Sequence, residues 1–173
     1  MEVLEAIRGR RSVRVFTDQP VSDEEVKTLI DAALNAPSAG NIQPWEFIVI
    51  KKAEVKRRLV VAALNQTFIE QAPVVIVICA NTKASGSGYG GRGVTLYCIQ
   101  DTATATQNIL LAAFSMGLGT CWIGAFKEEE VRAVLGIPEG FRPVAIIPVG
   151  HGMGNPPKHP RRPLNEVVHY EAF

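Results

Sequence analysis

Five consecutive β-branched residues, Val74-Val75-Ile76-Val77-Ile78, are the most constraining feature of this sequence. Such a run is typical of a strand buried on both faces, because a half-exposed strand alternates apolar with polar residues. The apolar stretch 74–80 is far shorter than the ~20 residues that cross a bilayer, so we expect no transmembrane helix. The run therefore predicts a sheet that is covered on each face by another layer.

The rest of the chain alternates between helical and extended patterns, without a repeat or a linker. Further strands are predicted at 46–50, 120–123 and 144–149, and the tail from residue 150 is expected to run extended over a surface. Strands separated by helices indicate a single domain over residues 1–173 of the α/β or α+β class. The predicted helices are a short one that ends at 8–11, one at 23–35 with a capping box of Ser22 and Glu25, and others at 53–64, at 102–116 with Asp101 as N-cap, and at 128–135.

Charge and cysteine usage exclude several classes of protein. Eighteen basic and seventeen acidic residues leave a formal charge of +1, which excludes a uniformly basic nucleic-acid binder but leaves room for a local basic patch. The N-terminus carries two acids and no basic segment before an apolar one, so we expect no signal peptide and a cytoplasmic location. Cys79, Cys98 and Cys121 form no CxxC or Cys/His cluster and are interpreted as buried hydrophobic residues, with no metal site expected.

Two common catalytic patterns fail. The string Gly86-Ser87-Gly88-Tyr89-Gly90-Gly91 satisfies GxGxxG, but it does not join a strand directly to a helix, so we interpret 86–93 as a flexible surface loop or lid. The three histidines lie in the last 23 residues and no GxSxG elbow is present. An enzyme built on this chain would therefore need a bound cofactor for its chemistry.

The strongest signal for a ligand is the basic run Arg10-Arg11-Ser12-Val13-Arg14. In an extended segment residues 10, 12 and 14 point to one side, which places two guanidinium groups and a hydroxyl on the same face. Guanidinium groups donate paired charge-assisted hydrogen bonds, and serine adds a donor, so this face suits a phosphate. For the run alone, a solvated cationic patch is the simpler interpretation.

A second segment, at 36–45, lies between a predicted helix and a predicted strand. It has the sequence APSAGNIQPW and offers hydroxyl and amide groups on a backbone stiffened by two prolines. Helix-stop and turn chemistry explains Pro37 and Gly40 but not Asn41, Gln43 and Trp45 together. The segment therefore favours a binding role.

Taken in chain order, these motifs resemble the FMN-dependent nitroreductase family. They are Arg-Arg-Ser-Val-Arg at 10–14, the segment 36–45, Gly-Leu-Gly-Thr-Cys-Trp-Ile-Gly at 117–124, and Pro-Arg-Arg-Pro-Leu at 160–164 followed by Val-Val-His-Tyr at 167–170. Each string alone is weak, but together they cover nearly the whole chain in order.

The resemblance implies an α+β three-layer sandwich with a mixed central sheet flanked by helices. It also implies an intertwined homodimer with two FMN sites at the interface. The implied activity is ping-pong: NADH or NADPH reduces FMN and leaves, and an electron-poor acceptor then takes the electrons through flavin N5. Nitroaromatics, quinones and free flavins are typical acceptors, and neither nucleic acid nor membrane is expected as a partner.

Other functions fit the same residues. A flavin-binding sensor or carrier would keep FMN with little turnover, and a related flavin reaction such as reductive dehalogenation or oxidative flavin cleavage would use the same fold. A weaker alternative is an anion-binding or RNA-binding module that uses the basic residues at 8–14, which predicts a steep salt dependence and no flavin absorbance.

The resemblance further implies a set of flavin contacts, with no side chain in a catalytic role. Arg10 and Ser12 would hold the phosphate and ribityl chain, and Arg14 would lie near the pyrimidine edge, where reduction leaves negative charge near N1 and O2. The turn that contains Gly124 would present a backbone N–H to flavin N5. The complete set is Arg10, Arg11, Ser12, Arg14, Pro37, Ser38, Asn41, Gln66, Ile123, Gly124, Ala125, Arg161 and Arg162.

The remaining members of this set have separate implied roles. The loop residues 37, 38 and 41 would lie along the flavin of the partner subunit, and Gln66 would give an amide contact to the ring. Arg161 and Arg162 would complete the phosphate site, although structural roles for Gln66 and Arg162 are equally consistent with their positions. We expect the basic residues at the two ends of the chain to converge on one phosphate region, namely Arg8, Arg10, Arg11, Arg14, Lys158, Arg161 and Arg162.

Overall fold

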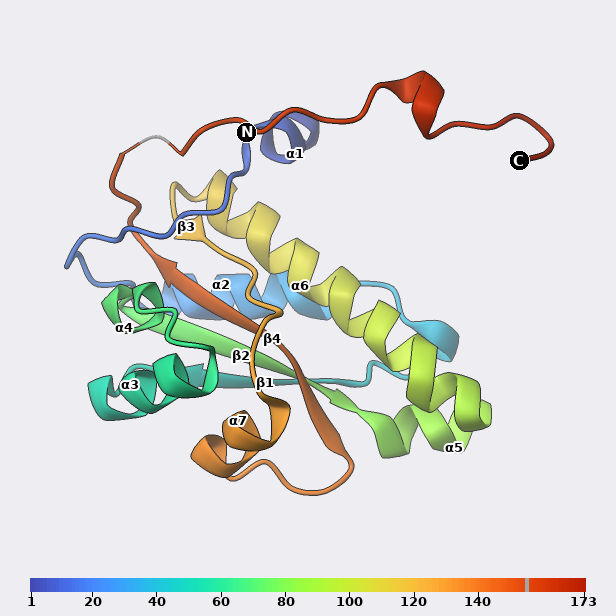
Figure 1. Ribbon diagram of the computed structural model, residues 1–173, viewed down its shortest axis with the longest axis horizontal. Helices are drawn as coiled ribbons and strands as arrows, with labels where there is room; N and C mark the ends of the chain where they lie inside the picture. The colour runs from blue at the N-terminus through green and yellow to red at the C-terminus, as the bar shows by residue number, and fades with distance from the viewer. Residues whose placement is uncertain (155) are drawn as a thin grey trace.

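A computed structural model describes residues 1–154 and 156–173 and has an α+β architecture with a four-stranded sheet flanked by helices (Figure 1). The strands lie in the order β1 (Trp45–Ile50), β2 (Val74–Asn81), β4 (Phe141–Gly150) and β3 (Gly119–Thr120), and neighbouring strands pair antiparallel. A parallel bridge joins Ser12 to Thr120. The family resemblance implies a mixed sheet. Within the described ranges, this bridge is the one parallel pairing, and the strands themselves all pair antiparallel.

Strand β2 is buried along its length, as its β-branched run predicted, and it supplies two separate cores. Ile76 pairs with Ile147 of β4, and both side chains are fully buried on one face together with residues of α2 (Asp23–Leu34) and α6 (Cys98–Ser115). Burying one such side chain stabilises the fold by about 1.5–3 kcal/mol. This face forms the first helix-on-sheet layer.

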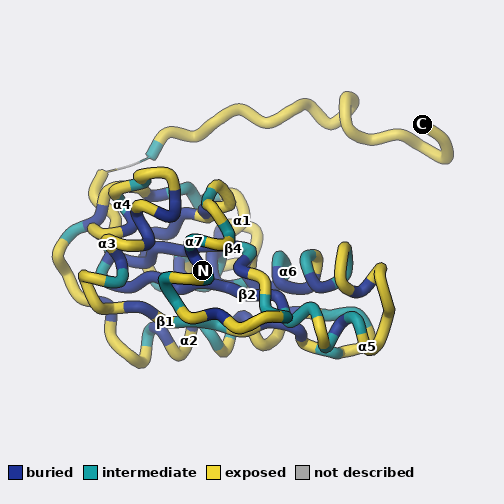
Figure 2. The backbone as a smooth tube through the Cα atoms, turned by 60° about the horizontal axis from the view of Figure 1, so that its bottom comes forward, coloured by how far each residue is buried: buried dark blue, intermediate teal, exposed yellow. Residues whose placement is uncertain are grey.

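The opposite face of the sheet forms the second layer. Val77 pairs with Ile146 of β4, and both pack with α3 (Ala53–Ala62), α4 (Phe68–Gln71) and α7 (Glu128–Leu135). Helices therefore cover both faces, and the dark interior strands in Figure 2 lie between more exposed helices. The period-two alternation of side chains along a buried strand is what divides one apolar run between two cores.

The capping box predicted at the start of α2 is confirmed. The Ser22 hydroxyl accepts a hydrogen bond from the Glu25 backbone N–H at 3.2 Å, and the Glu25 carboxylate accepts one from the Ser22 N–H at 2.8 Å. Helices α2, α3 and α7 begin at the predicted residues, and α7 also ends as predicted. The predicted strand at 120–123 is wrong in extent, because only Gly119–Thr120 pairs as a strand and Ile123 makes an isolated bridge to Ile146.

The prediction of a flexible loop or lid at 86–93 is wrong, because this segment belongs to α5 (Thr82–Arg92) and its junction with a π-helical turn, η2 (Gly93–Tyr97). The Asn81 side chain caps α5 by accepting a hydrogen bond from the Ala84 N–H at 3.0 Å. Gly93 is needed for close packing, since a Cβ there would overlap the backbone oxygen of Ser85. Glycine content indicated flexibility, but here it allows two helical segments to touch.

The prediction that Asp101 caps a helix is also wrong. Helix α6 begins at Cys98 as a continuation of η2, so the preceding turn satisfies its first N–H groups. Asp101 therefore lies inside the helix, and its buried carboxylate accepts a hydrogen bond from the Ala39 N–H at 3.1 Å. The tertiary partner, rather than the helix end, determines the role of this residue.

The N-terminal helix and the first part of the C-terminal tail lie near each other at one end of α6, whereas the C-terminus itself lies far from the N-terminus (Figure 1). Helix α1 (Val3–Gly9) packs there, with Gly9 against the ring of Phe114. After β4 the exposed tail is extended, as predicted, with one short turn at η3 (Leu164–Glu166), but beyond α1 it leaves the body instead of running over a surface of the same chain (Figure 2). In the described part of the chain, no helix is both long enough and apolar enough to span a membrane.

Candidate functional site

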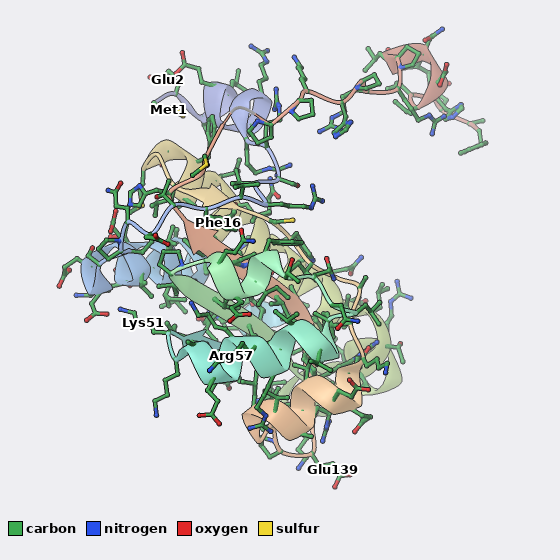
Figure 3. The ribbon with its side chains drawn as sticks, turned by 60° about the vertical axis from the view of Figure 1, so that its left-hand side comes forward. Met1, Glu2, Phe16, Lys51, Arg57 and Glu139 are labelled. Carbon is green, nitrogen blue, oxygen red and sulfur yellow. The ribbon has the colours of Figure 1, made fainter. Side chains whose placement is uncertain are left out.

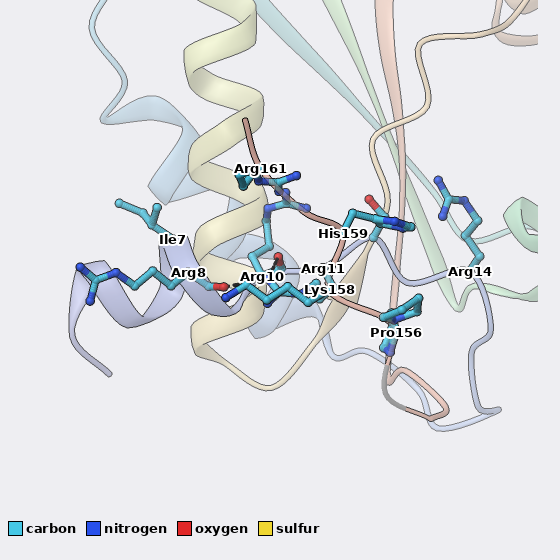
Figure 4. A pocket seen from close by; sticks show the side chains of 11 residues that line it. Ile7, Arg8, Arg10, Arg11, Arg14, Pro156, Lys158, His159 and Arg161 are labelled. Atoms are coloured by element: carbon cyan, nitrogen blue, oxygen red, sulfur yellow. Dashed lines mark hydrogen bonds between the residues drawn. The ribbon is translucent and has the colours of Figure 1, made fainter. Parts of the chain in front are cut away.

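A pocket of about 490 Å³ lies between α1, the segment that follows it and the tail (Figure 4). It brings together six basic residues from the two ends of the chain, as the sequence predicted. Arg162 is the one predicted member that does not line it. The lining residues are Ile7, Arg8, Arg10, Arg11, Ser12, Arg14, Pro156, Pro157, Lys158, His159 and Arg161.

Backbone pairing explains why three predicted residues share this pocket. Ser12 forms the parallel bridge to Thr120, and the Val13 N–H donates a hydrogen bond to the Thr120 carbonyl at 2.9 Å. This pairing holds the backbone extended at Ser12 and Val13, so Val13 points into the interior while Ser12 and Arg14 on either side of it line the pocket. Val13 and Phe16, the latter labelled in Figure 3, are both buried and anchor the segment to the body of the protein.

The pocket carries positive charge without compensating acids. Burial lowers the pKa of Arg10, and the neighbouring charges of Arg161 and Arg11 lower it further. None of the ion pairs found among residues 1–154 and 156–173 involves a basic residue of the pocket. An anion bound here would relieve the repulsion between the guanidinium groups and replace the water lost on burial.

Two of the predicted arginines have other partners. Arg11 donates from Nη1 to the carbonyls of Arg8 at 2.7 Å and Arg10 at 2.8 Å, so it caps the end of α1 while it lines the pocket. Arg162 lies 3.4 Å from the Glu166 carboxylate and donates to the Glu166 carbonyl at 2.9 Å. The structure thus keeps Arg162 within its own short turn and away from the pocket.

Arg14 connects the basic pocket to the next part of the site. Its guanidinium carbon lies 5.9 Å from the ring centroid of Phe68, a distance typical of a cation–π contact. Beneath it, burial raises the pKa of the Cys121 thiol, and the charge of Arg14 opposes that shift. The thiol is therefore buried and neutral, in agreement with its predicted hydrophobic role.

Gln66 is joined to the glycine-containing turn that follows β3. Its side-chain Nε2 donates to the Ala63 carbonyl and to the Ala125 carbonyl, each at 2.9 Å. Both amide hydrogens are therefore used, and Oε1 is the group left to accept from a ligand. Gly124 and Ala125 are exposed beside it.

The three predicted turn residues do not have the same role. The Ile123 N–H donates to the Ile146 carbonyl at 3.0 Å and its side chain is buried, so this N–H is unavailable to a ligand. Gly124 and Ala125 lie beyond that bridge. Thr120, which pairs with Ser12 of the pocket, and Gly124 are four residues apart, which limits their separation to about 13 Å at ~3.3 Å per residue. Three contacts connect the basic pocket to the Gly124 turn: Ser12 with Thr120, Arg14 with Phe68, and Gln66 with Ala125.

The predicted loop residues Pro37, Ser38 and Asn41 lie elsewhere. Their loop contains a 3₁₀ turn, η1 (Ala39–Asn41), and packs at Asp101 near the start of α6, whereas α1 packs at Phe114 near its end. These two α6 positions are 13 residues apart, about 20 Å at ~1.5 Å per residue. Within one chain, the loop and the basic pocket therefore do not meet.

Two residues of this surface were not singled out by the sequence. His159 lines the pocket, but a histidine in a polar tail gives no local signal of a site. Phe68 begins the four-residue helix α4 and meets Arg14 only because the chain folds back over 54 positions. Neither contact follows from local spacing.

The three-layer fold carries a basic pocket at one end of α6, and its lining offers donors of the kind that suit an anionic group. Comparison with known proteins makes the class specific: residues 7–67 and 60–151 match the nitroreductase family. The chain belongs to the nitroreductase family and is an oxidoreductase of that type.

Named relatives cover nearly the whole chain. A protein of Archaeoglobus fulgidus with NAD(P)H nitroreductase in its name is 38% identical over 99% of this chain and 91% of its own length. The FMN reductase (NADPH) of Bacillus subtilis is 33% identical over 98% of this chain and 74% of its own. Among solved structures, the NADPH:FMN oxidoreductase of Vibrio harveyi, complexed with NAD⁺, superimposes with a TM-score of 0.91 at 32% identity, over 99% of this chain and 77% of that one.

Proposed function

We propose that this protein is an NAD(P)H-dependent FMN oxidoreductase that passes electrons through flavin N5 to an electron-poor acceptor, namely a nitroaromatic, a quinone or a free flavin. The observation that carries the proposal is the series of contacts that connects the basic pocket, through Arg14 and Gln66, to the Gly124 turn. The relatives named for FMN reduction and NAD(P)H nitroreduction support it.

The donor set of the pocket fits the phosphate of FMN. Arg10, Ser12 and Arg161 offer charged and neutral donors, and the pocket residues include no carboxylate. A phosphate dianion prefers such a set, because each guanidinium gives paired charge-assisted hydrogen bonds. Arg10, Ser12 and Arg161 would hold the phosphate end, and Lys158 and Arg8 would add long-range attraction.

The remainder of the surface fits a flavin ring. Arg14 supplies positive charge between the pocket and Gln66, whose Oε1 can accept from a ring N–H. The exposed Gly124 backbone has no side chain to block close approach. When bound, FMN supplies two-electron transfer, so the chain itself has to bind, orient and stabilise charge rather than act as an acid or base.

We also propose that the active form is a homodimer and that the loop with Pro37, Ser38 and Asn41 completes the flavin site of the partner subunit. The loop and the basic pocket lie at opposite ends of α6, which is consistent with contributions to two different sites. The tail supports an intertwined assembly because it leaves large apolar side chains exposed. These are Leu164, Val167, Val168, Tyr170 and Phe173.

The decisive experiment is the absorption spectrum of the purified protein, followed by anaerobic addition of NADH or NADPH. We expect bound oxidised FMN, bleaching by at least one of the two donors, and return of the colour when a quinone or nitroaromatic is added. Bound FMN that neither donor bleaches would indicate a sensor or carrier. Protein that neither contains flavin nor binds added FMN would refute the assignment.

A further inference from the structure

The loop at 37–43 contains hydrogen bonds that involve Gln43, a residue to which no role has yet been assigned. Its side-chain Nε2 donates to Asn41 Oδ1 at 3.1 Å, and its backbone N–H donates to the Ser38 hydroxyl oxygen at 2.9 Å. One residue thus contacts the side chains of both polar members of the proposed flavin loop.

These contacts determine which hydrogen-bonding groups the loop presents. Because Gln43 donates to Asn41 Oδ1, the Asn41 amide is oriented with its Nδ2 hydrogens directed to other partners. Because the Ser38 oxygen already accepts from Gln43, its hydroxyl hydrogen is the group most available to a ligand. The loop consequently offers two donors on exposed or half-exposed side chains.

The loop is held rigidly enough to make this orientation matter. The Ala39 N–H donates to Asp101 at 3.1 Å, and the Thr104 hydroxyl donates to the Pro37 carbonyl at 3.1 Å. Both anchors belong to α6. They fix the first half of the loop to the longest helix of the fold.

The second half of the loop is locked by its backbone. Asn41 and Gln43 have φ values of 55° and 54°, in the left-handed region that non-glycine residues rarely adopt. Gly40 also has a positive φ, 55°, and a Cβ there would push the Tyr89 hydroxyl aside. Such conformations cost energy and persist where the surrounding structure holds them, often at ligand sites.

We propose that the side chain of Gln43 is a positioning group that fixes the Asn41 amide as a hydrogen-bond donor toward an acceptor group of the bound flavin, beside the Ser38 hydroxyl, which the backbone N–H of residue 43 orients. The inference rests on the proposed function, in which this loop contacts the flavin. Gln43 acts through Asn41 and does not itself touch the cofactor. A loop that presents donors selects for carbonyl oxygens and unprotonated ring nitrogens and against N–H groups.

A double-mutant cycle measured on the full-length protein tests this role. Gln43→Met keeps the size of the side chain but cannot donate, and Asn41→Gly removes the amide while tolerating the positive φ. We expect Gln43→Met to raise the dissociation constant for FMN about 3- to 10-fold, the value of one hydrogen bond. In the Asn41→Gly background, the same substitution should change that constant less than about twofold, because the group that Gln43 orients is gone.

A second variant separates orientation from simple packing. Gln43→Glu has the same shape, but an ionised carboxylate only accepts, so the Asn41 amide would turn to donate to it and present its oxygen to the flavin. We expect weaker binding than for Gln43→Met, with riboflavin as well as FMN, which excludes repulsion of the phosphate as the cause. Circular dichroism spectra matching those of the wild type establish that the variants are folded.

The possible failures are distinguishable. Equal effects of Gln43→Met with and without Asn41, or wild-type affinity in Gln43→Glu, would overturn the positioning role while leaving the proposed oxidoreductase intact. Unchanged FMN affinity in Asn41→Gly would overturn both the flavin contact of Asn41 and the role of Gln43. Wild-type protein that binds no FMN would refute the proposed function itself.

Discussion

The side-chain amide of Gln66 and the carbonyl of Ala125, 59 residues apart in the chain, are joined by a 2.9 Å hydrogen bond. The same nitrogen donates to the Ala63 carbonyl at the end of α3, so Gln66 ties that helix end to the exposed Gly124 turn. The position of the turn that would approach a flavin therefore depends on a residue from the opposite half of the chain.

Gln66→Leu should lower the free energy of unfolding by about 1–3 kcal/mol, because it removes two hydrogen bonds at about 0.5–1.5 kcal/mol each. Chemical denaturation measures this change. Gln19→Leu is a suitable control, since Gln19 is exposed and contributes only its backbone N–H to the hydrogen bonds of the described residues. Equal stability of the two variants would contradict the structural link.

Arg10→Ala should weaken FMN retention by about 1.5–3 kcal/mol, the range for a hydrogen bond to a charged group. Arg162→Ala is its matched control, because Arg162 pairs with Glu166 and does not line the pocket. A dissociation constant for FMN can be obtained by fluorescence titration. If the two substitutions weakened binding alike, the phosphate site would have to include Arg162.

Asp101 should make the protein less stable as the pH rises. Burial raises the pKa of its carboxyl above the ordinary 3.8, so the folded state holds this proton more tightly than the unfolded state does. Its contribution is therefore most favourable below pH 3.8 and is lost as the pH rises through the folded-state pKa.

Asp101→Asn should remove that dependence and raise the free energy of unfolding at neutral pH by about 1 kcal/mol, because a neutral amide costs less to bury and can still accept from the Ala39 N–H. Urea denaturation between pH 4 and 8 tests the sign. The prediction would be contradicted if Asp101→Asn were less stable than the wild type at neutral pH and if this deficit in the free energy of unfolding grew as the pH rises.

Truncation after Arg162 should weaken the proposed homodimer while keeping Arg161 in the pocket. The removed residues include Tyr170 and Phe173, which are 84% and 107% exposed in the single chain and would gain from burial against a second copy. We expect the dimer dissociation constant to rise at least about tenfold, equivalent to about 1.4 kcal/mol. Sedimentation analysis over a range of concentrations provides the measurement, and an unchanged constant would place the interface elsewhere.

Gly93→Ala should destabilise the protein by about 1–3 kcal/mol, because the new Cβ would overlap the Ser85 carbonyl oxygen in a well-packed junction. Gly91→Ala is the control: its Cβ would enter open space in a helical segment, where alanine is favoured by up to about 1 kcal/mol. Thermal unfolding should therefore shift in opposite directions for the two variants. A shift in the same direction would indicate that 86–93 behaves as a loop.

Local pattern was sufficient for the layers of this fold. The β-branched run at 74–78 required a strand with two covered faces, and the capping box of Ser22 and Glu25 located the start of α2. Both signals act between residues that are close in sequence, so no knowledge of distant contacts was needed. The expectation that the basic residues at the two ends of the chain converge rested on the resemblance of the motifs, in their order, to a known family, and not on local geometry.

Tertiary contacts decided what local pattern could not. Arg11 turned to the carbonyls at the end of α1, the Ile123 N–H was taken by Ile146, and Asp101 became the anchor of the Ala39 loop rather than a helix cap. In each case several partners were chemically acceptable, and the choice went to the group that folding brought within hydrogen-bonding distance. The sequence by itself determined which groups can bind a phosphate and a flavin, whereas only the tertiary structure decided which of them are still free to do so.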